Sequence, residues 1–498
     1  MALSGQSWFG SGIADAAAAR PRAAAIIRDD GEVSFGDFYR TVERFAAALW
    51  ARGVRPGQAP GLPPGAGTVA LAHNTACQRP GVAVLGLAPH DPAAVARALI
   101  ASAGAPAVIA GGAAMPADWQ VPTWSIGSEW QDADPTGLPP PPANDAPCYL
   151  TRSSGTTGGL PKLTTTSHGQ EAADVDHGWW SFPLDEGDRY LSVIAFHFGF
   201  GRTGAQRALM RGGAVVLPPP LRSMAGLLSS VAAHRPTWTL LTPTHLRELM
   251  AVAPPSGRLL DGMRIVFGSA PLSGAELRRV TTLISGEVYP QYGANETGCL
   301  TIATPDDVRR NPDAVGRPNP ETQMQVVDIE DAPCPPGIVG TVRFRNPRFP
   351  QGYHRADPDA TSRFVGGWFY PGDAGMIDED GLLVLKGRVD DLINVGGQKV
   401  YPTDIEGRLA QHPDVVEAAA FGIDDPVRGS AVAAAVVLRS PVAIADLIEH
   451  CRLTLGLARS PRRIVAVPAL PRNEIGKIDR VALRRHIGGR VADDAGQE

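Results

Sequence analysis

The chain has 498 residues, of which 44% are hydrophobic and 19% are charged, and its formal net charge is −5. This balance is typical of a globular protein of two or more domains and argues against a disordered chain. The small negative charge gives no overall attraction to nucleic acid or to an anionic membrane, so we expect neither as a partner.

The cysteines and the N-terminal segment indicate in which cellular compartment the protein is expected. The five cysteines are scattered and include no CxxC pair, which argues against a disulfide framework and a zinc site. Residues 1–20 lack the basic start and apolar run of a signal peptide. No stretch approaches the roughly 20 apolar residues that span a bilayer. We therefore expect a cytoplasmic protein.

Three candidate boundaries divide the chain. Four successive prolines, Pro139 to Pro142, are incompatible with helix or central strand, so Leu138 to Pro147 is interpreted as a connection. A turn region rich in Pro and Gly covers Asn346 to Gly352. The third boundary, Gly387 to Asp391, follows the strand-like run Leu382 to Leu385.

Strand and helix signals alternate between the first two boundaries, which favours an α/β domain with a large sheet. The predicted strands here are Ala214–Leu217, Thr239–Leu241 and Arg264–Phe267, and the predicted helices are Thr244–Ala251 and Gly274–Ile284.

The C-terminal part repeats this mixture on a smaller scale. We predict an α/β protein with a large N-terminal domain of sheets and packed helices, 1–387, and a smaller mobile α+β domain, 388–498. The elements predicted in the smaller domain are helices at Ile405–Gln411 and Ile444–Thr454 and strands at Val415–Gly422 and Ala431–Leu438.

The segment from Thr151 to Lys162 is the strongest local signal for chemistry. Its glycines let backbone amides approach a ligand, its hydroxyl groups extend an anion-binding concavity, and Lys162 adds a positive charge, which suits a polyphosphate. It is not a Walker A loop, because Pro161 precedes the lysine and Leu163 follows it. A flexible Ser/Thr/Gly linker is the alternative interpretation. The expected phosphate-binding residues are Ser153, Ser154, Gly155, Thr156, Thr157, Gly158 and Lys162.

This segment resembles the phosphate loop of the adenylate-forming superfamily, which includes acyl- and aryl-CoA synthetases, nonribosomal peptide synthetase adenylation domains and firefly luciferase. The resemblance extends from about Tyr149 to Arg480, and four further motifs follow in the family's order. They are Tyr292–Glu296, similar to Tyr–Gly–x–Thr–Glu; Tyr370–Asp373, which ends in the ribose-binding aspartate; the hinge motif Gly387–Asp391; and the terminal lysine motif Pro471–Arg480.

The resemblance implies an ATP- and Mg²⁺-dependent enzyme that converts a small carboxylic acid to an acyl-AMP. It then implies transfer of the acyl group to a phosphopantetheine thiol of coenzyme A or of an acyl carrier protein. Because the acid and ATP are both anionic, catalysis is mainly positioning and neutralisation. A stand-alone amino-acid adenylation enzyme and a non-catalytic nucleotide-binding relative are the alternative hypotheses.

Individual residue roles combine this resemblance with side-chain chemistry. Glu296 is a hard oxygen ligand suited to Mg²⁺, Asp373 can accept both ribose hydroxyl protons, and Arg388 can donate to ribose or phosphate oxygens. The resemblance alone assigns Lys477, which would bridge the acid carboxylate and the α-phosphate, so the expected catalytic residues are Lys477, Glu296 and Lys162. Further nucleotide contacts are expected at Gly268, Ser269, Ala270, Tyr292, Gly293 and Asn295.

A domain rotation is also implied by the resemblance. Enzymes of this family rotate the smaller domain between half-reactions, about a residue that matches Asp390. Rotation would remove Lys477 and bring in the loop that contains Gly396, Gly397 and Lys399, which suits a thiol channel. As an alternative, the two glycines form only a hairpin turn.

The sequence departs from the family pattern at three places. Asn295 replaces the usual threonine beside Glu296, and Leu163 stands where glycine commonly follows the lysine. A Gly- and Pro-rich run, Gln58 to Gly67, precedes a compressed stretch, Thr68 to Pro106. We therefore expect residues 1–150 to be reduced, which affects oligomerisation and outer packing more than chemistry.

The acid pocket is expected around Ala195 to Gly201. This stretch has no carboxylate to pair with a substrate ammonium, whose unpaired burial would cost several kcal/mol. Its aromatic residues suit an aryl or short acyl acid, although buried phenylalanines are often simply core. The turn Gly268 to Leu272 also resembles that of CoA ligases. The expected pocket residues are Phe196, His197, Phe198, Cys299 and Leu300.

Overall fold

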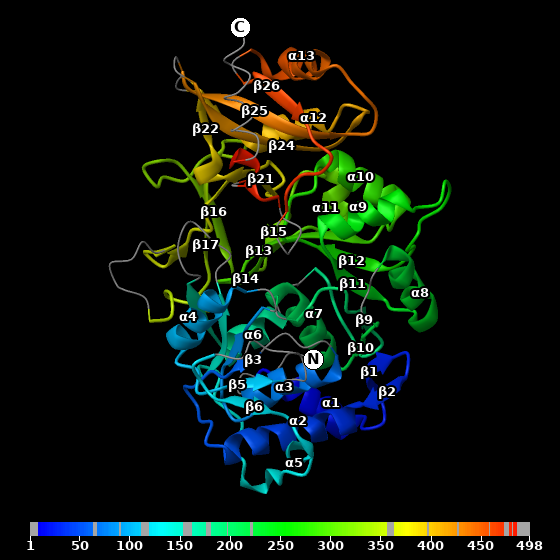
Figure 1. The fold of residues 1–498 in the computed structure, drawn as a ribbon, viewed down its shortest axis with the longest axis vertical. Helices are drawn as coiled ribbons and strands as arrows, with labels where there is room; N and C mark the ends of the chain where they lie inside the picture. The colour runs from blue at the N-terminus through cyan, green and yellow to red at the C-terminus, as the bar shows by residue number, and fades with distance from the viewer. Residues whose placement is uncertain are drawn as a thin grey trace.

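The computed structural model describes residues 8–62, 67–88, 91–110, 119–152, 162–175, 181–196, 198–219, 223–355, 363–395, 398–425, 428–457, 459–472, 478–480 and 482–485. In Figure 1 the N-terminal elements lie at one end of the molecule and the C-terminal elements at the other, with the middle of the chain between them.

A nine-stranded sheet forms the centre of the N-terminal part. Its order is β15-β14-β13-β12-β11-β9-β10-β1-β2; neighbours from β13 to β1 are parallel, and the strands at both edges are antiparallel. The bounds are β15 Arg317–Pro318, β14 Gly298–Ile302, β13 Val288–Ala294, β12 Arg264–Phe267, β11 Trp238–Leu241, β9 Arg189–Leu191, β10 Ala214–Val216, β1 Ala24–Arg28 and β2 Gly31–Ser34.

Both faces of this sheet are buried. Val266 of β12 belongs to one hydrophobic cluster, whereas Ile265 and Phe267 belong to another, because successive strand residues point to opposite faces. The helices that cover the faces are α1 Ser11–Ala19, α2 Phe35–Ala51, α3 Thr68–Gln78 and α7 Gly199–Met210 on one side, and α8 Met224–His234, α9 Pro243–Ala251, α10 Gly274–Leu283 and α11 Pro305–Arg310 on the other.

A six-stranded sheet of order β6-β5-β3-β4-β7-β8 is built from the region predicted to be reduced. The proline-rich segment 138–147 joins strands of this one sheet, so its interpretation as a domain boundary is wrong. The bounds are β3 Gly61–Leu62, β4 Val84–Gly86, β5 Val108–Ala110, β6 Thr123–Ser125, β7 Pro147–Arg152 and β8 Leu163–Ser167, with helices α4 Ala93–Ala103, α5 Ser128–Gln131 and α6 His168–Ala173 and a 3₁₀ turn at Pro135–Gly137.

A third sheet follows the nine-stranded sheet in the chain. The turn region 346–352 connects two of its strands and is therefore not a domain boundary either. Leu300, Val342 and Phe369 are among the buried residues of its core. The bounds are β16 Gln323–Val327, β17 Gly340–Arg345, β18 Phe364–Val365, β19 Trp368–Phe369, β20 Asp373–Ile377 and β21 Leu383–Arg388.

The C-terminal elements have two hydrophobic clusters of their own, whose described members all follow residue 392. A short 3₁₀ turn, Val389–Asp391, connects β21 to them. The elements are β22 Ile393–Val395, β23 Gln398–Val400, α12 Pro402–Leu409, β24 Val415–Asp425, β25 Gly429–Leu438, α13 Ile444–Leu455 and β26 Arg463–Ala466. This arrangement is the small α+β unit that the sequence predicts.

The elements predicted from local patterns are confirmed. The strand Arg264–Phe267 has the predicted bounds, and α9 begins after Thr242, whose side chain accepts the His245 backbone N–H as an N-cap. The predicted strands at 415–422 and 431–438 are each extended by a few residues in β24 and β25.

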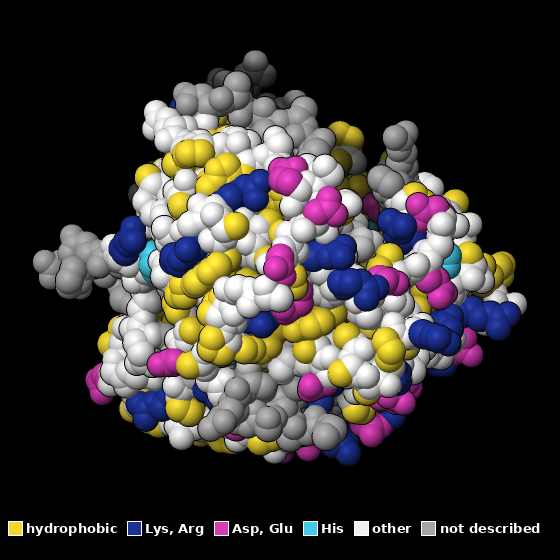
Figure 2. All heavy atoms as spheres, turned by 90° about the horizontal axis from the view of Figure 1, so that it is seen from below, with side chains coloured by type: hydrophobic (Ala, Val, Ile, Leu, Met, Phe, Trp, Pro, Cys, Tyr) yellow, Lys and Arg dark blue, Asp and Glu magenta, His cyan; other side chains and the backbone are white. Residues whose placement is uncertain are grey.

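On the face in Figure 2, positively and negatively charged side chains are interspersed among apolar ones. Within the part of the chain that is described, no helix is long and apolar enough to cross a bilayer.

Candidate functional site

The site lies where the central parallel strands end. Strands β11, β12 and β13 are neighbours and parallel, so their carboxyl ends share one edge of the sheet, where open α/β sheets bind ligands. Gly268 follows β12 at this edge, and a Cβ there would lie 2.9 Å from the carbonyl oxygen of Gln291. Ser269 has a φ of +75°, which is uncommon outside glycine and marks a constrained turn.

Tyr292, Asp373 and Arg388 are brought together across two sheets. The Tyr292 hydroxyl donates to Oδ2 of Asp373 at 2.5 Å, and Nη1 of Arg388 donates to Oδ1 at 3.2 Å. Burial, reinforced by the charge of Asp373, raises the pKa of Tyr292 well above its usual value, so its hydroxyl stays a donor. Each carboxylate oxygen has two lone pairs, so Asp373 retains capacity to accept ribose hydroxyls.

Glu296 lies in the turn between β13 and β14 and is only 1% exposed. The Tyr353 hydroxyl donates to its Oε1 at 3.3 Å, and Nη1 of Arg363 lies 3.7 Å from the same oxygen. The Lys162 ammonium is 4.9 Å from the centre of the Tyr353 ring. Burial, with the nearby charge of Glu296, raises the pKa of Tyr353 to about 12. Tyr353 therefore connects the lysine of the phosphate segment with the buried glutamate.

The remaining oxygen of Glu296 is suited to a cation. Oε2 is buried and has no hydrogen-bond partner among the described residues, and an unpaired buried carboxylate oxygen is costly. No group of three His, Cys, Asp or Glu side chains gathers around a common point in the described part of the chain. The residues present therefore fit a Mg²⁺ held by one protein carboxylate and by nucleotide oxygens.

Asn295 anchors this turn to the strand that enters the phosphate segment. Its side-chain amide donates to the carbonyl oxygen of Arg152 at 3.1 Å. Arg152 in turn donates from Nη1 to both carboxylate oxygens of Asp91, at 2.7 and 2.8 Å. The asparagine that departs from the family pattern thus makes a structural hydrogen bond between two predicted nucleotide-binding segments.

Three phenylalanines of the expected acid pocket share one hydrophobic cluster with Cys299. Phe196 and Cys299 are buried in it, and Phe198 and Phe200 pack against it. A Cβ at Gly268 would lie 3.6 Å from the Phe200 ring. Leu300 belongs instead to the core of the third sheet, because consecutive strand residues face opposite sides.

The predicted hinge residue and one predicted thiol-channel residue occupy exposed positions. Asp390 is exposed in the 3₁₀ turn after β21. Lys399 is exposed on β23, which pairs with β22 through Val395 and Gln398.

Ten predicted site residues lie outside the described residues, and no geometry is assigned to them. They are Ser153, Ser154, Gly155, Thr156, Thr157, Gly158, His197, Gly396, Gly397 and Lys477.

Tyr353 and Arg363 contact the candidate site but were not predicted from the sequence. The only local signal was that Tyr353 follows Gly352 in the turn region, which was interpreted as a boundary. A hydrogen bond from His354 N to the Leu163 carbonyl at 2.6 Å places this turn beside the phosphate segment. That contact spans nearly two hundred residues and has no signature in local sequence.

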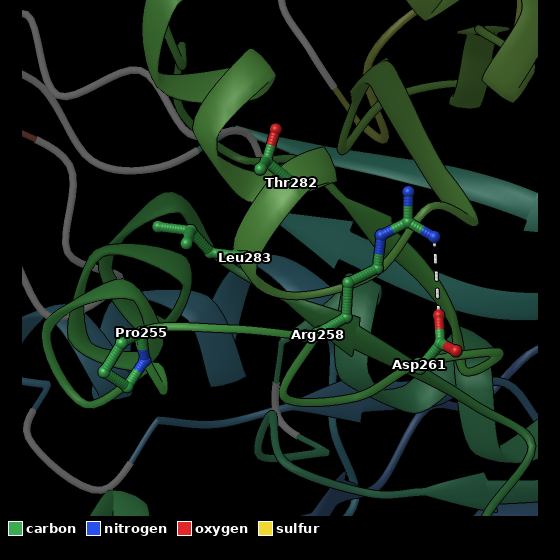
Figure 3. A pocket seen from close by; sticks show the side chains of 6 residues that line it. Pro255, Arg258, Asp261, Thr282 and Leu283 are labelled. Carbon is green, nitrogen blue, oxygen red and sulfur yellow. Dashed lines mark hydrogen bonds and ion pairs between the residues drawn. The ribbon is translucent and has the colours of Figure 1, made fainter.

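A hollow of about 410 Å³ lies elsewhere on the molecule (Figure 3). It is lined by the loop that precedes β12 and by the end of α10, so it lies toward the amino ends of the parallel strands. An ion pair between Arg258 and Asp261 spans 3.4 Å at its rim. Its lining includes no predicted site residue: Pro255, Gly257, Arg258, Asp261, Thr282 and Leu283.

The comparisons with known proteins agree with this geometry. The AMP-binding enzyme family model matches residues 13–354, and the AMP-binding enzyme C-terminal domain model matches residues 404–477. A sulfoacetate–CoA ligase of Cupriavidus necator is 32% identical over 354 residues, 70% of this chain and 68% of that protein. A salicyl-AMP ligase/salicyl-S-ArCP synthetase of Mycobacterium tuberculosis is 33% identical over 370 residues, 71% and 64% of the two chains.

Solved structures of similar proteins share the whole fold. The amide bond synthetase McbA of Marinactinospora thermotolerans superposes with a TM-score of 0.85 at 30% identity, over 96% of this chain and 99% of that one. The chain therefore belongs to the AMP-binding, adenylate-forming enzyme family.

Proposed function

We propose that this enzyme activates an aryl or short acyl carboxylic acid with ATP and Mg²⁺ and transfers the acyl group to coenzyme A or to a carrier-protein phosphopantetheine. In the first step a carboxylate oxygen attacks the α-phosphorus, and the bond to the β-phosphate oxygen breaks to release pyrophosphate. In the second step the thiol sulfur attacks the acyl carbon, and AMP leaves. Neither step needs a protein nucleophile.

The observation that carries this proposal is the junction of Lys162, Tyr353 and Glu296. Tyr353 contacts both Lys162, whose ammonium is 4.9 Å from its ring, and Glu296, whose buried Oε2 has no hydrogen-bond partner among the described residues. This supports a site for Mg·ATP, which would need a cation and an available carboxylate oxygen. Asp373, fixed by Tyr292 and Arg388, would accept the ribose hydroxyls.

The character of the acid is supported by the pocket segment. Phe196, Phe198 and Cys299 give an apolar wall. Asp174 lies beside Gly298, where a Cβ would be 3.6 Å from its carboxylate, but Nη2 of Arg207 already donates to that carboxylate. A substrate ammonium would therefore compete with a buried arginine for this partner. An acid without an α-ammonium fits better.

The acceptor is the less constrained part of the proposal. The curated relatives named above include a CoA ligase and a carrier-protein synthetase, whereas McbA is an amide bond synthetase. We favour a thiol because the segment around Lys399 resembles CoA ligases. An amine acceptor is the competing outcome.

The test is a hydroxamate-trapping panel of carboxylic acids with ATP and Mg²⁺. Benzoate-like or short acyl acids should exceed all twenty amino acids. A clear preference for an α-amino acid would overturn the assignment of the acid and favour an amino-acid adenylation enzyme.

A further inference from the structure

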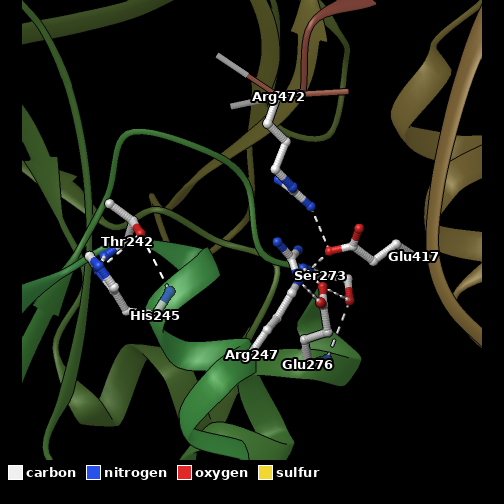
Figure 4. Close-up of polar contacts among 7 residues, drawn as sticks. All are labelled: Thr242, His245, Arg247, Ser273, Glu276, Glu417 and Arg472. Atoms are coloured by element: carbon white, nitrogen blue, oxygen red, sulfur yellow. Dashed lines mark hydrogen bonds and ion pairs between the residues drawn. The ribbon is translucent and has the colours of Figure 1, made fainter. Parts of the chain in front are cut away.

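Four charged side chains join the C-terminal domain to the helices that cover one face of the central sheet (Figure 4). Arg247 lies on α9 and Glu276 on α10, whereas Glu417 lies on β24 and Arg472 lies in the terminal lysine motif. Arg247 Nε is 2.6 Å from Glu276 Oε1 and 3.6 Å from Glu417 Oε1, and Arg472 Nη2 is 2.5 Å from Glu417 Oε1. Their side chains are 18–24% exposed.

We propose that Glu417 and Arg247 are positioning residues that latch the C-terminal domain in the acid-activating arrangement. The inference rests on the proposed function, because it requires two half-reactions and a domain that moves between them. It adds a charged contact outside the 3₁₀ turn of Asp390, and this contact would favour one of the two arrangements.

The latch acts at the segment that carries the terminal lysine. Arg472 forms a β-bridge with Ile478, and Asp479 N donates to the Pro471 carbonyl at 2.8 Å. These contacts hold together the two described flanks of the motif, 471–472 and 478–479, which form its base. Glu417 holds Arg472, and Arg247 holds Glu417, so this base is fixed to α9.

The helices on the other side of the latch begin at the site. α9 follows β11, and α10 follows the turn after β12, so both start at the sheet edge that carries Gly268. The Ser273 backbone N–H and hydroxyl also donate to Glu276, at 2.9 and 2.8 Å. A contact with Arg247 therefore fixes the position of the C-terminal domain relative to the nucleotide-binding edge of the central sheet.

The alternation of positive and negative side chains along this contact explains how the latch can open. The order Arg472, Glu417, Arg247, Glu276 alternates in sign, and the 3.6 Å contact is the longest of the three. If the domain rotates, Arg472 stays with Glu417 and Arg247 stays with Glu276. No carboxylate or guanidinium is left unpaired, so opening avoids the penalty of an uncompensated buried charge.

The experiment measures the two half-reactions separately in single turnovers, with the best acid from the hydroxamate panel. Glu417→Gln and Arg247→Gln should each slow acyl-AMP formation about 2- to 5-fold, as expected for a partly exposed ion pair. Neither should slow thioester formation from supplied acyl-AMP. The double variant should be no slower than the slower single variant, because either single substitution already breaks the Arg247–Glu417 contact, which crosses between the domains.

Two further variants separate positioning from stability. Arg247→Lys keeps the charge and should retain more acyl-AMP formation than Arg247→Gln. Asp425→Asn removes an ion pair with Arg462 inside the C-terminal domain, on the same strand as Glu417, and should not favour one half-reaction over the other. Equal losses in both steps, additive losses in the double variant, or no change would each overturn the latch. Absence of both half-reactions in the unaltered enzyme would instead refute the proposed function.

Discussion

The Tyr292 hydroxyl donates a hydrogen bond to the Asp373 carboxylate, although the two residues are 81 positions apart in the chain. Tyr292 lies on the central sheet and Asp373 begins β20 of the third sheet. This contact therefore fixes the position of the proposed ribose-binding carboxylate relative to the nucleotide-binding edge.

Replacing Tyr292 by phenylalanine should raise the KM for ATP about 2- to 13-fold, because one hydrogen bond of about 0.5–1.5 kcal/mol is lost. The kcat should change less. Tyr289→Phe is a matched control on the same strand, since that hydroxyl donates to Glu287 instead. An unchanged KM in Tyr292→Phe would show that the contact does not position the nucleotide.

Glu296→Gln tests the proposed magnesium ligand. Removing the charge should lower acyl-AMP formation about 100-fold or more and shift its dependence on Mg²⁺ to higher concentration. The measurement is pyrophosphate exchange across a Mg²⁺ titration. Glu287→Gln, an exposed glutamate at the start of the same hairpin, is the control. A Mg²⁺ dependence identical to that of the unaltered enzyme would rule Glu296 out as a ligand.

Lys477→Ala should nearly abolish acyl-AMP formation, by about 10²–10³-fold or more, because a charge contact made in the transition state is lost. Thioester formation from supplied acyl-AMP should be spared. Both rates are measured in single turnovers. Equal losses in the two steps would contradict the role assigned to this lysine.

Asp390→Pro should leave acyl-AMP formation largely intact and slow the thiol step. Proline fixes φ near −65°, close to the value of a 3₁₀ turn, so it suits the observed arrangement and resists rotation away from it. Asp390→Ala removes the carboxylate but keeps backbone freedom, so it should slow neither step. If both rates of the proline variant fall together, Asp390 is structural and not a hinge.

Local sequence predicted the elements but not their long-range partners. The apolar run of β12 and the Thr–Pro–Thr start of α9 carry their own signals, and both elements have nearly the predicted bounds. The prolines from Pro139 to Pro142 also predicted a connection. They do not reveal that β7 then returns to the sheet of β3 to β6, because strand pairing is set by residues distant in the chain.

In the candidate site, too, residues within compact motifs were predicted, whereas residues that act through long-range contacts were not. Glu296 and Asp373 belong to motifs that are compact in sequence, so the resemblance identified them. Tyr353 acts through contacts with Lys162 and Glu296, which lie far from it in the chain. Arg247 and Glu417 carry no motif at all. Only packing brings these pairs together, so no pattern of neighbouring residues predicts them.

The most direct test follows radiolabelled ATP in a reaction with the preferred acid and Mg²⁺, which is then divided among coenzyme A, a phosphopantetheine-bearing carrier protein and an amine. Acid-dependent acyl-AMP should form in every portion. The proposed thiol transfer should then convert it to a thioester, with release of AMP, when coenzyme A or a phosphopantetheine-bearing carrier protein is added. Acyl-AMP that yields no thioester with either thiol, or that yields an amide only with an added amine, would contradict it.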